Sequence, residues 1–493
     1  MRKAILGMMM QMLLIGMLLL ILFNIPFKAE AKTIIVPDDY STIQAAINAA
    51  NPGDTIYVKS GLYFENIIVN KTVTLKGENR DTTIIDGMQR TVVVSIDDAS
   101  GVIFNGFTVQ NGSNPSLPSM QHVGIGVRKC SNVKIQNNVV KGNDEGIWLL
   151  GSSNCIVDGN FIFNNKCPGI RITSKAFNNI ISNNTIINNF HGICLLQTSH
   201  NKLLRNTISE NTQWGISLYD LATFNEIVEN IISDNQYGIF VPSSSSNNTI
   251  SGNTITNNWY GISLYNSTNN KFYHNNFINN TLQVYDSSWD NPSLPSSINI
   301  WDDGYPSGGN YWSDYSEADL FSGPYQNKTG SDGIGDTPYI VDANKTDHYP
   351  LMKPFNTFEA GVWNETAYNI NIVSNSTISN FKFDVDQKSV CFNVNGTDGT
   401  VGFCRVTIPK SLLWADNGWT IFVDDQPVTD YTRFQDENFT YLYFTYNHST
   451  HTVIIQGTNV IPELPSTLTL IMFTLTTLIA TTFWKTKRKH QPP

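Results

Sequence analysis

Short alternating runs of apolar and polar residues recur along the first half of the chain, as in "GISLY" (215–219), "NEIVEN" (225–230) and "NIISDN" (230–235). Alternation with a period of two places one face of each run in a core and predicts β-strands. A Gly-Ile pair marks each cycle of three runs, at steps of 22 and then 23 residues. The pairs begin at Gly124, Gly146, Gly169, Gly192, Gly215, Gly238 and Gly261. Three strands per coil of about 23 residues predict an all-β fold, a right-handed parallel β-helix.

Asparagine repeats with the same period. One column comprises Asn138, Asn160, Asn184, Asn206, Asn230, Asn253 and Asn276, and a second comprises Asn179, Asn201, Asn225 and Asn248. Asparagine tolerates left-handed backbone at turns, and stacked amides form hydrogen-bonded ladders. We therefore interpret both columns as structural rather than catalytic.

The residues before the regular repeat fit the same plan. Irregular first coils are predicted from strand-like runs at 55–58, 64–69, 72–77, 82–87, 91–96 and 104–109. Residues 41–50 form a short amphipathic pattern, which predicts a helix that covers the exposed first edge of the β-helix. The β-helix is thus expected over residues 32–285.

The segment "TIIVPDDYSTIQAAINAANPGDTIYVKSGLYFENIIVNKTVTLKGE", together with the repeat, resembles the NosD-type family of pectin-lyase-like β-helices. That family is also called the carbohydrate-binding and sugar-hydrolysis domain. The resemblance covers residues 33–355, including "WDDGYPSGGNYWSDY" (301–315) and "SDGIGDTPY" (331–339). It implies the fold strongly and the function only weakly, because one fold hosts many activities.

Residues 286–357 are rich in Trp, Tyr, Asp, Gly and Pro, which predicts a loop-rich cap over the end of the β-helix. Asp332 and Asp336 surround glycines, with Asp302, Asp303 and Asp314 near in sequence. Oxygen-rich clusters suit Ca²⁺. The alternative is that these aspartates cap turns.

Residues 358–458 contain seven short alternating runs, which predict a β-sandwich. Cys391 and Cys404 flank the turn segment 395–399. Pairing across a hairpin there predicts a disulfide, which an exported chain permits.

The two ends predict export and anchoring. Residues 1–31 have a basic start, a long apolar run and an A-x-A site, as in a signal peptide; an uncleaved anchor is the alternative. Residues 461–493 contain "IPELP", similar to the Pro-Glu-Phe type of sorting signal in archaea, then a predicted membrane helix and a basic tail. We therefore expect a single-pass cell-surface protein whose bulk is extracellular. Glycosylation sequons include Asn70, Asn266, Asn327, Asn364, Asn395 and Asn438.

The net charge of −10, with only 15% charged residues, limits the classes of molecule that the protein is expected to bind. An acidic surface repels phosphate backbones, so a nucleic-acid partner is not expected. A neutral-polar surface favours glycans or cell-envelope components as partners.

An aromatic stripe follows the Gly-Ile register. The position before the glycine holds His191, Trp214, Tyr237 and Tyr260, and Tyr219 and Tyr265 face outward nearby. Sugar rings pack their apolar faces on such side chains. The stripe is therefore the candidate ligand-binding site; alternatively it packs beneath the cap or the sandwich.

Two other functions compete with non-catalytic binding by an adhesin or scaffold. A polysaccharide lyase, hydrolase or epimerase would need clustered carboxylates and a base, for which Asp144, Glu145, Arg171 and His191 are the candidates. A surface ion pair is the simpler interpretation of these residues. Copper handling, suggested by the family name, is the remote alternative, with Cys194 as the candidate outward-facing thiol.

Overall fold

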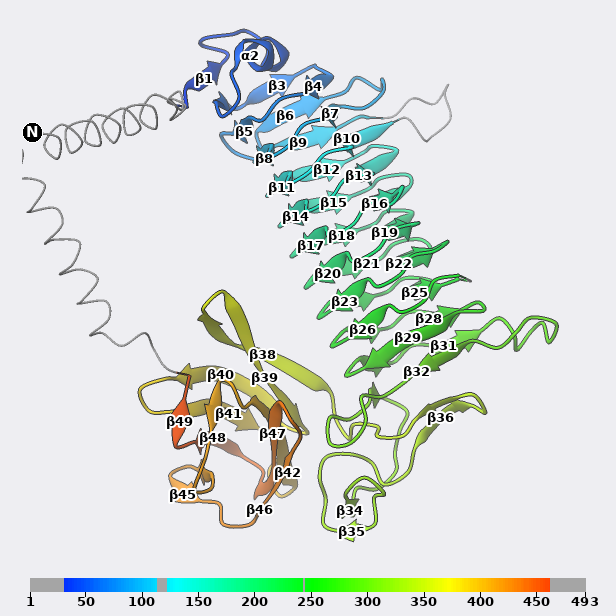
Figure 1. Ribbon diagram of the computed structural model, residues 1–493, viewed down its shortest axis with the longest axis vertical. Helices are drawn as coiled ribbons and strands as arrows, with labels where there is room; N and C mark the ends of the chain where they lie inside the picture. The colour runs from blue at the N-terminus through cyan, green and yellow to red at the C-terminus, as the bar shows by residue number, and fades with distance from the viewer. Residues whose placement is uncertain (1–30, 113–121, 243, 462–493) are drawn as a thin grey trace, which may run out of the picture.

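The computed structural model describes residues 31–112, 122–242 and 244–461, and its main body is a three-sided parallel β-helix (Figure 1). Each coil contributes one strand to each of three parallel sheets, here called sheets A, B and C. The sheets run along the long axis of the molecule, with the N-terminal coil at one end and the cap and sandwich at the other. The all-β prediction is confirmed.

The strands follow the coil order in each sheet. Sheet A consists of β1 (Thr33–Val36), β2 (Thr55–Val58), β5 (Thr74–Gly77), β8 (Ile103–Asn105), β11 (Lys134–Gln136), β14 (Ile156–Asp158), β17 (Ile180–Ser182), β20 (Lys202–Leu204), β23 (Glu226–Val228), β26 (Thr249–Ser251), β29 (Thr268–Tyr273) and β32 (Ile298–Ile300). Sheet B consists of β3 (Gly61–Tyr63), β6 (Thr83–Asp86), β9 (Thr108–Gln110), β12 (Val139–Lys141), β15 (Phe161–Phe163), β18 (Thr185–Ile187), β21 (Thr207–Ser209), β24 (Ile231–Ser233), β27 (Thr254–Thr256), β30 (Asn276–Ile278) and β33 (Tyr311–Trp312). Sheet C consists of β4 (Ile67–Val69), β7 (Val94–Asp97), β10 (Val123–Arg128), β13 (Glu145–Leu150), β16 (Pro168–Thr173), β19 (His191–Leu196), β22 (Trp214–Tyr219), β25 (Tyr237–Val241), β28 (Tyr260–Leu264) and β31 (Leu282–Asp286). The parallel sheets therefore continue past residue 285, to Trp312.

The isoleucine of each Gly-Ile pair lies in one buried column. Strand register pairs the isoleucines of successive coils, and each is fully buried. The column comprises Ile147, Ile170, Ile193, Ile216, Ile239 and Ile262. This is the arrangement that the Gly-Ile period predicts.

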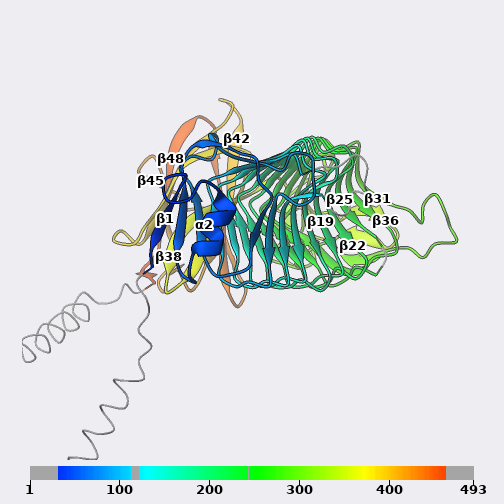
Figure 2. The same cartoon turned by 90° about the horizontal axis from the view of Figure 1, so that it is seen from above.

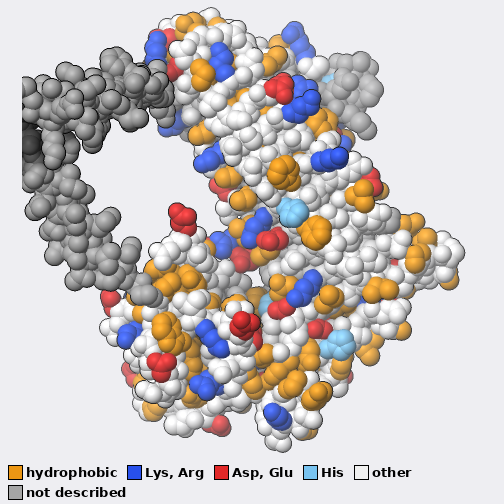
Figure 3. All heavy atoms as spheres, viewed as in Figure 1, with side chains coloured by type: hydrophobic (Ala, Val, Ile, Leu, Met, Phe, Trp, Pro, Cys, Tyr) orange, Lys and Arg blue, Asp and Glu red, His pale blue; other side chains and the backbone are white. Residues whose placement is uncertain are grey.

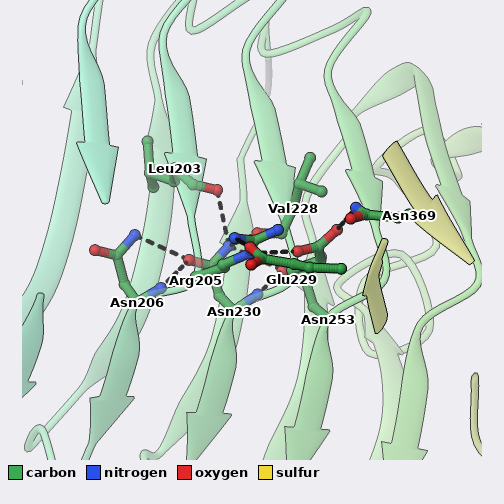
Figure 4. A network of polar contacts seen from close by, with 9 residues as sticks. Leu203, Arg205, Asn206, Val228, Glu229, Asn230, Asn253 and Asn369 are labelled. Atoms are coloured by element: carbon green, nitrogen blue, oxygen red, sulfur yellow. Dashed lines mark hydrogen bonds and ion pairs between the residues drawn. The ribbon is translucent and has the colours of Figure 1, made fainter. Parts of the chain in front are cut away.

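Asparagine ladders close the turns between sheets (Figure 4). Asn230 Oδ1 accepts hydrogen bonds from the backbone N–H and the side-chain amide of Asn206, both at 2.9 Å. The Asn230 amide donates to the carbonyls of Leu203 and Val228 and to Asn253 Oδ1. The Asn230 side chain thus satisfies backbone groups on two coils and the side chain of a third, so the column is structural, as the sequence predicts.

The structure adds one ladder and corrects another. A third ladder follows the sheet-B strands and comprises Asn143, Asn165, Asn189, Asn211, Asn235, Asn258 and Asn280. Asn275 rather than Asn276 continues the first predicted column, because Asn275 Oδ1 accepts the Asn253 N–H. The Asn276 amide instead binds the backbone of Phe355 at the start of the sandwich.

Helix α2 (Ile43–Ala49) covers the N-terminal end of the β-helix. Thr42 caps it by accepting a hydrogen bond from the Ala45 N–H. Ile43, Ala46 and Ile47 are fully buried in the same core as the first coils. The predicted capping helix is confirmed; it shields an edge that would otherwise pair with another chain.

Aromatic rings close the other end of the core. Trp301 stacks on Phe272 at 4.6 Å and Trp312 stacks on Phe277 at 4.3 Å between ring centroids. Tyr339 then stacks on Trp312 at 4.2 Å. The rest of the cap is loop with two small hairpins: β34 (Phe321–Ser322) with β35 (Lys328–Thr329), and β36 (Tyr339–Asp342) with β37 (Lys345–Asp347).

Two antiparallel sheets after the cap form the predicted β-sandwich. One comprises β38 (Phe355–Trp363), β39 (Thr366–Ser374), β42 (Val401–Pro409), β47 (Phe439–Asn447) and β46 (Tyr431–Gln435). The other comprises β40 (Thr377–Asp384), β41 (Ser389–Asn395), β48 (Thr450–Gln456), β44 (Thr420–Val423) and β45 (Gln426–Pro427), and a small pair adds β43 (Leu413–Trp414) and β49 (Asn459–Val460). Alternating residues of both sheets build one buried core.

The predicted Cys391–Cys404 disulfide is wrong for this structure, because both cysteines are free thiols. β41 and β42 do not pair as a hairpin; they belong to opposite sheets. Cys391 alternates with the core residues Val390 and Phe392 and is half-buried, whereas Cys404 is fully buried. The turn between them crosses the sandwich instead of returning along the same sheet.

The sandwich contacts the β-helix at the turns between sheets A and B. Arg205 pairs with Glu229 at 2.7 Å and with Glu359 of the sandwich, and the Asn369 amide donates to Glu229 (Figure 4). Figure 3 shows charges of both signs gathered where the two bodies meet, on a surface that is otherwise mostly neutral. The sandwich therefore lies away from sheet C, as Figures 1 and 2 both show.

Within the described residues, no helix has the length and apolar character required to cross a membrane. The predicted C-terminal membrane segment and nearly all of the predicted signal peptide lie outside those residues.

Candidate functional site

The outward-facing side chains of sheet C form two rows across successive coils, here called the sheet-C outer face. One row precedes the glycine and the other follows the isoleucine. The second row alternates with the buried isoleucines and therefore faces outward. The first row also faces outward because the glycine itself points into the core, where an added Cβ would meet interior side chains. The first row comprises Glu145, Pro168, His191, Trp214, Tyr237 and Tyr260. The second comprises Trp148, Arg171, Cys194, Ser217, Phe240, Ser263 and Tyr285.

Aromatic rings stack along this face. His191 and Trp214 are nearly parallel, at 7° and 4.0 Å between centroids, and Trp214 stacks on Phe240 at 5.3 Å. Tyr237 stacks on Tyr260 at 5.0 Å and also contacts Phe240. The predicted stripe thus forms two stacked pairs, His191 with Trp214 and Tyr237 with Tyr260, which Phe240 joins.

The stripe is partly open to solvent. His191, Trp214, Tyr237 and Tyr260 are half-buried. Tyr219 and Tyr265 are 40% and 38% exposed. Because the sandwich lies on another side of the β-helix, the alternative in which it covers the stripe does not apply. The cap meets only the end of the stack, where Trp289 contacts Tyr285 edge-on.

Sequence reasoning missed Trp148, Phe240 and Tyr285, which extend the aromatic surface. Trp148 and Phe240 directly follow the isoleucine of a Gly-Ile pair, whereas Tyr285 follows Val284, which takes the place of that isoleucine in the last coil. Cys194, Ser217 and Ser263 hold that position in other coils, so the row does not look aromatic in the sequence.

A groove of about 560 Å³ continues the same face toward the N-terminus. Trp148, Leu150 and Ile68 line it, together with Arg128. Asp97 holds the Arg128 guanidinium through both carboxylate oxygens, at 2.6 and 2.9 Å. Asn66, Thr91 and Ser95 also line the groove, so its surface is mixed apolar and polar, with its cation already paired.

A buried charged pair lies between the groove and the aromatic stack. Arg171 Nη2 lies 3.0 Å from Glu145 Oε1, and Glu145 is only 1% exposed. Burial raises the pKa of Glu145 to about 7, with Arg171 opposing the shift. Burial, with help from Arg171, lowers the pKa of His191 to about 4. At neutral pH His191 is uncharged and Glu145 is partly protonated.

Asp144 does not join this pair. Its carboxylate contacts His122 Nδ1 at 2.9 Å and Lys166 Nζ at 3.1 Å. The four predicted catalytic candidates are thus divided: Glu145, Arg171 and His191 converge on the sheet-C outer face, whereas Asp144 belongs to another contact.

We predict that Glu145→Gln changes how stability depends on pH. The pKa of Glu145 is ordinarily 4.5 and rises to about 7 in the folded chain. The contribution of Glu145 to the free energy of unfolding is therefore full below pH 4.5 and is lost as pH rises through 7. The wild-type advantage over the glutamine variant should therefore shrink by up to about 3 kcal/mol across that range. Urea unfolding at a series of pH values measures it.

His191 supplies the control because its pKa moves in the opposite direction. Its contribution is present above its ordinary pKa of 6.5 and is lost as pH falls through about 4. His191→Gln should therefore change the pH profile with the opposite sign. Equal profiles for both variants and the wild type would contradict the burial argument.

The predicted calcium site and the predicted copper-binding thiol do not bring metal-binding side chains together. Asp332 accepts the Ile334 N–H and so caps a local turn, whereas Asp336 accepts the N–H groups of Leu320 and Phe321 and joins two segments of the cap. No group of three or more His, Cys, Asp or Glu side chains suited to a metal ion occurs among the described residues. Cys194 lies on the outer face but is buried, which raises the pKa of its thiol to about 11.

Comparison with known proteins defines the class. The fold and the repeat are those of a right-handed parallel β-helix, and a family described as "Right handed beta helix region" matches residues 28–186 and 123–282, more than half of the chain. The chain belongs to this family. The resemblance to pectin-lyase-like β-helices is confirmed at the level of the fold.

A curated relative, the probable pectinesterase/pectinesterase inhibitor 6 of Arabidopsis thaliana, is 28% identical over 165 residues. The match covers 28% of this chain and 29% of the relative, so the chain spans less than a third of that protein's length.

Solved structures are similar at low identity. The surface adhesin PfbA of Streptococcus pneumoniae is 14% identical with a TM-score of 0.42, over 69% of this chain and 98% of that chain. An alginate lyase from Paenibacillus sp. str. FPU-7 is 15% identical with a TM-score of 0.39, over 57% and 97%. The pectate lyase Pel9A is 14% identical with a TM-score of 0.42, over 60% and 84%.

Proposed function

We propose that this chain is an exported, cell-surface adhesin or scaffold that binds carbohydrate on the sheet-C outer face. The observation that carries the proposal is the stack of half-buried rings from His191 to Tyr260 on consecutive coils. A parallel β-helix does not require aromatic residues there, since Pro168 occupies the same register position. Contiguous exposed apolar surface normally meets a partner.

The chemistry of the stack favours sugars. Pyranose rings present apolar C–H faces that pack on aromatic rings, and tyrosine hydroxyls at the edge bond sugar hydroxyls. Tyr219 and Tyr265 stand exposed beside the stack and supply such hydroxyls. The paired Arg128 and buried Glu145–Arg171 pair leave little free charge on this face, which favours neutral polysaccharide.

Trp214→Ala should weaken binding to polysaccharide by about tenfold to a hundredfold, because it removes the central ring of the stack. The purified full-length protein is tested on an array of immobilised polysaccharides. The free energy of unfolding should fall by only about 1–2 kcal/mol, since the ring is already half exposed.

Tyr325→Ala is the matched control, because Tyr325 is 83% exposed and lies in the cap, away from sheet C. It should bind as the wild type does. A Trp214→Ala protein that keeps full binding, or that melts far below the wild type, would end the proposal and leave the stripe with a structural role.

A second candidate function, polysaccharide cleavage or epimerisation, is favoured by one observation: Glu145 has a pKa of about 7, suited to acid–base chemistry, beside Arg171. The burial of Glu145 opposes it, because a general acid must reach the substrate. Release of reducing ends or unsaturated products from any array polysaccharide, abolished in Glu145→Gln, would favour this function over simple binding.

A further inference from the structure

A second pocket lies on the sandwich, far from sheet C in the sequence and independent of the function proposed above. It is an open hollow of about 530 Å³, a volume within the range of small-ligand sites. Its lining includes Trp414, Trp419, Lys410, Arg433, Gln435 and Thr440.

Two indole rings give the pocket an apolar wall. Trp419 is only 5% exposed and belongs to the sandwich core, and Tyr431 fixes its backbone by donating to the Trp419 carbonyl at 3.0 Å. Trp414 lies on β43, which pairs with β49, and is half-buried. One ring is thus a rigid floor and the other an accessible wall.

Polar and cationic groups complete the lining. Arg433 and Gln435 are two residues apart on β46 and share one face of the strand, and Gln435 pairs with Thr440 of β47. Lys410 is held at the edge, where its Nζ donates to the Asp436 carbonyl. An amide, a hydroxyl and two cationic side chains therefore border one space.

The two cations have no carboxylate partner. Among the described residues, neither Lys410 nor Arg433 forms an ion pair. The nearby Asp436 carboxylate is engaged by the N–H groups of Asn438 and Phe439 and by the Tyr441 hydroxyl.

From this combination we infer that the pocket binds an acidic sugar unit, a pyranose that carries a carboxylate or a sulfate. The indoles pack on the apolar face of the ring, the arginine and lysine meet the anion, and Gln435 and Thr440 bond hydroxyls. The sandwich thereby adds a charge-selective site to the largely neutral aromatic face of the β-helix.

Titration of the full-length protein with acidic oligosaccharides tests the inference, with quenching of tryptophan fluorescence as the readout. One arm uses an oligogalacturonate, the other a sulfated oligosaccharide, and a neutral oligosaccharide of equal length is the reference. At least one acidic ligand should bind tenfold or more tightly than the neutral one, and salt near 1 M should weaken that preference.

Trp414→Ala and Arg433→Gln should each weaken acidic binding at least tenfold, whereas Trp214→Ala should leave it unchanged, which separates this site from the sheet-C outer face. Arg90→Gln removes an exposed arginine of the β-helix and is the control for Arg433. Arg433 is exposed, so its variant tests the site even if Trp414→Ala fails to fold.

Equal affinity for acidic and neutral ligands, or acidic binding that survives both pocket variants, overturns the inference. Failure of the wild type to bind either acidic ligand also overturns it.

Discussion

Asn230→Ala should lower the free energy of unfolding by about 3–5 kcal/mol, among the largest effects expected of any single substitution in this chain. The side chain is fully buried and makes five hydrogen bonds along the ladder. Alanine would leave the Asn206 N–H and the Leu203 carbonyl in the interior without their hydrogen-bond partner. Each buried group left unpaired costs about 1–3 kcal/mol. Urea or thermal unfolding of the full-length protein measures the loss.

Two further variants show whether the ladder is responsible. Asn230→Asp keeps the shape and the acceptor oxygen but removes the amide donors, so it should be nearly as damaging as alanine. Asn247→Gly is the control, because Asn247 is exposed, bonds only Ser246 through its side chain, and has a φ of 57° that glycine tolerates. A loss below about 1 kcal/mol in Asn230→Ala would refute the ladder as a main source of stability.

The β-helix could be predicted because each coil repeats the same physical solution. An inward isoleucine, a glycine that fits where the next coil's backbone passes, and a ladder asparagine recur at nearly constant spacing. A Cβ on Gly146 would lie 2.3 Å from the Gly169 carbonyl oxygen, which explains why glycine persists there. Periodicity turns many weak local preferences into one strong pattern.

The pattern fails where coils become irregular. Asn275 and Asn276 are adjacent, and the sequence alone does not say which one enters the ladder; the contact of Asn276 with Phe355 decides it. The Cys391–Cys404 prediction failed similarly, because the connection between β41 and β42 passes from one sheet to the other. Neighbouring strands in sequence need not be neighbours in a sandwich.

At the candidate site, too, the sequence predicted some features and missed others. The register placed His191, Trp214, Tyr237 and Tyr260 in one row, and their rings do stack in two pairs. Burial could not be read from the register. Glu145 occupies the same row, yet it lies beneath its neighbours and pairs with Arg171.

Arg405→Ala should detach the sandwich from the cap, with a loss of about 3–4 kcal/mol. Arg405 lies on β42 and is 1% exposed; its guanidinium donates to the carbonyls of Asp332 and Pro306 in the cap. The guanidinium also lies over the Tyr441 ring, 5.0 Å from the centroid. Truncation leaves two buried carbonyls unpaired and removes the cation next to the buried Asp332 carboxyl, whose pKa burial raises and Arg405 lowers.

The measurement is differential scanning calorimetry combined with limited proteolysis. The wild type should unfold with the cap and sandwich coupled, whereas Arg405→Ala should show a separate, earlier sandwich transition and faster cleavage between β37 and β38. Arg405→Lys keeps the charge but loses the planar fork that reaches two carbonyls at once, so it should give an intermediate result. Lys382→Ala removes an exposed charge of the same sandwich and should change neither readout. If Arg405→Ala unfolds in a single transition at the wild-type temperature, the contacts at Arg205, Glu229 and Glu359 are sufficient to hold the sandwich, and Arg405 is not the link between the two bodies.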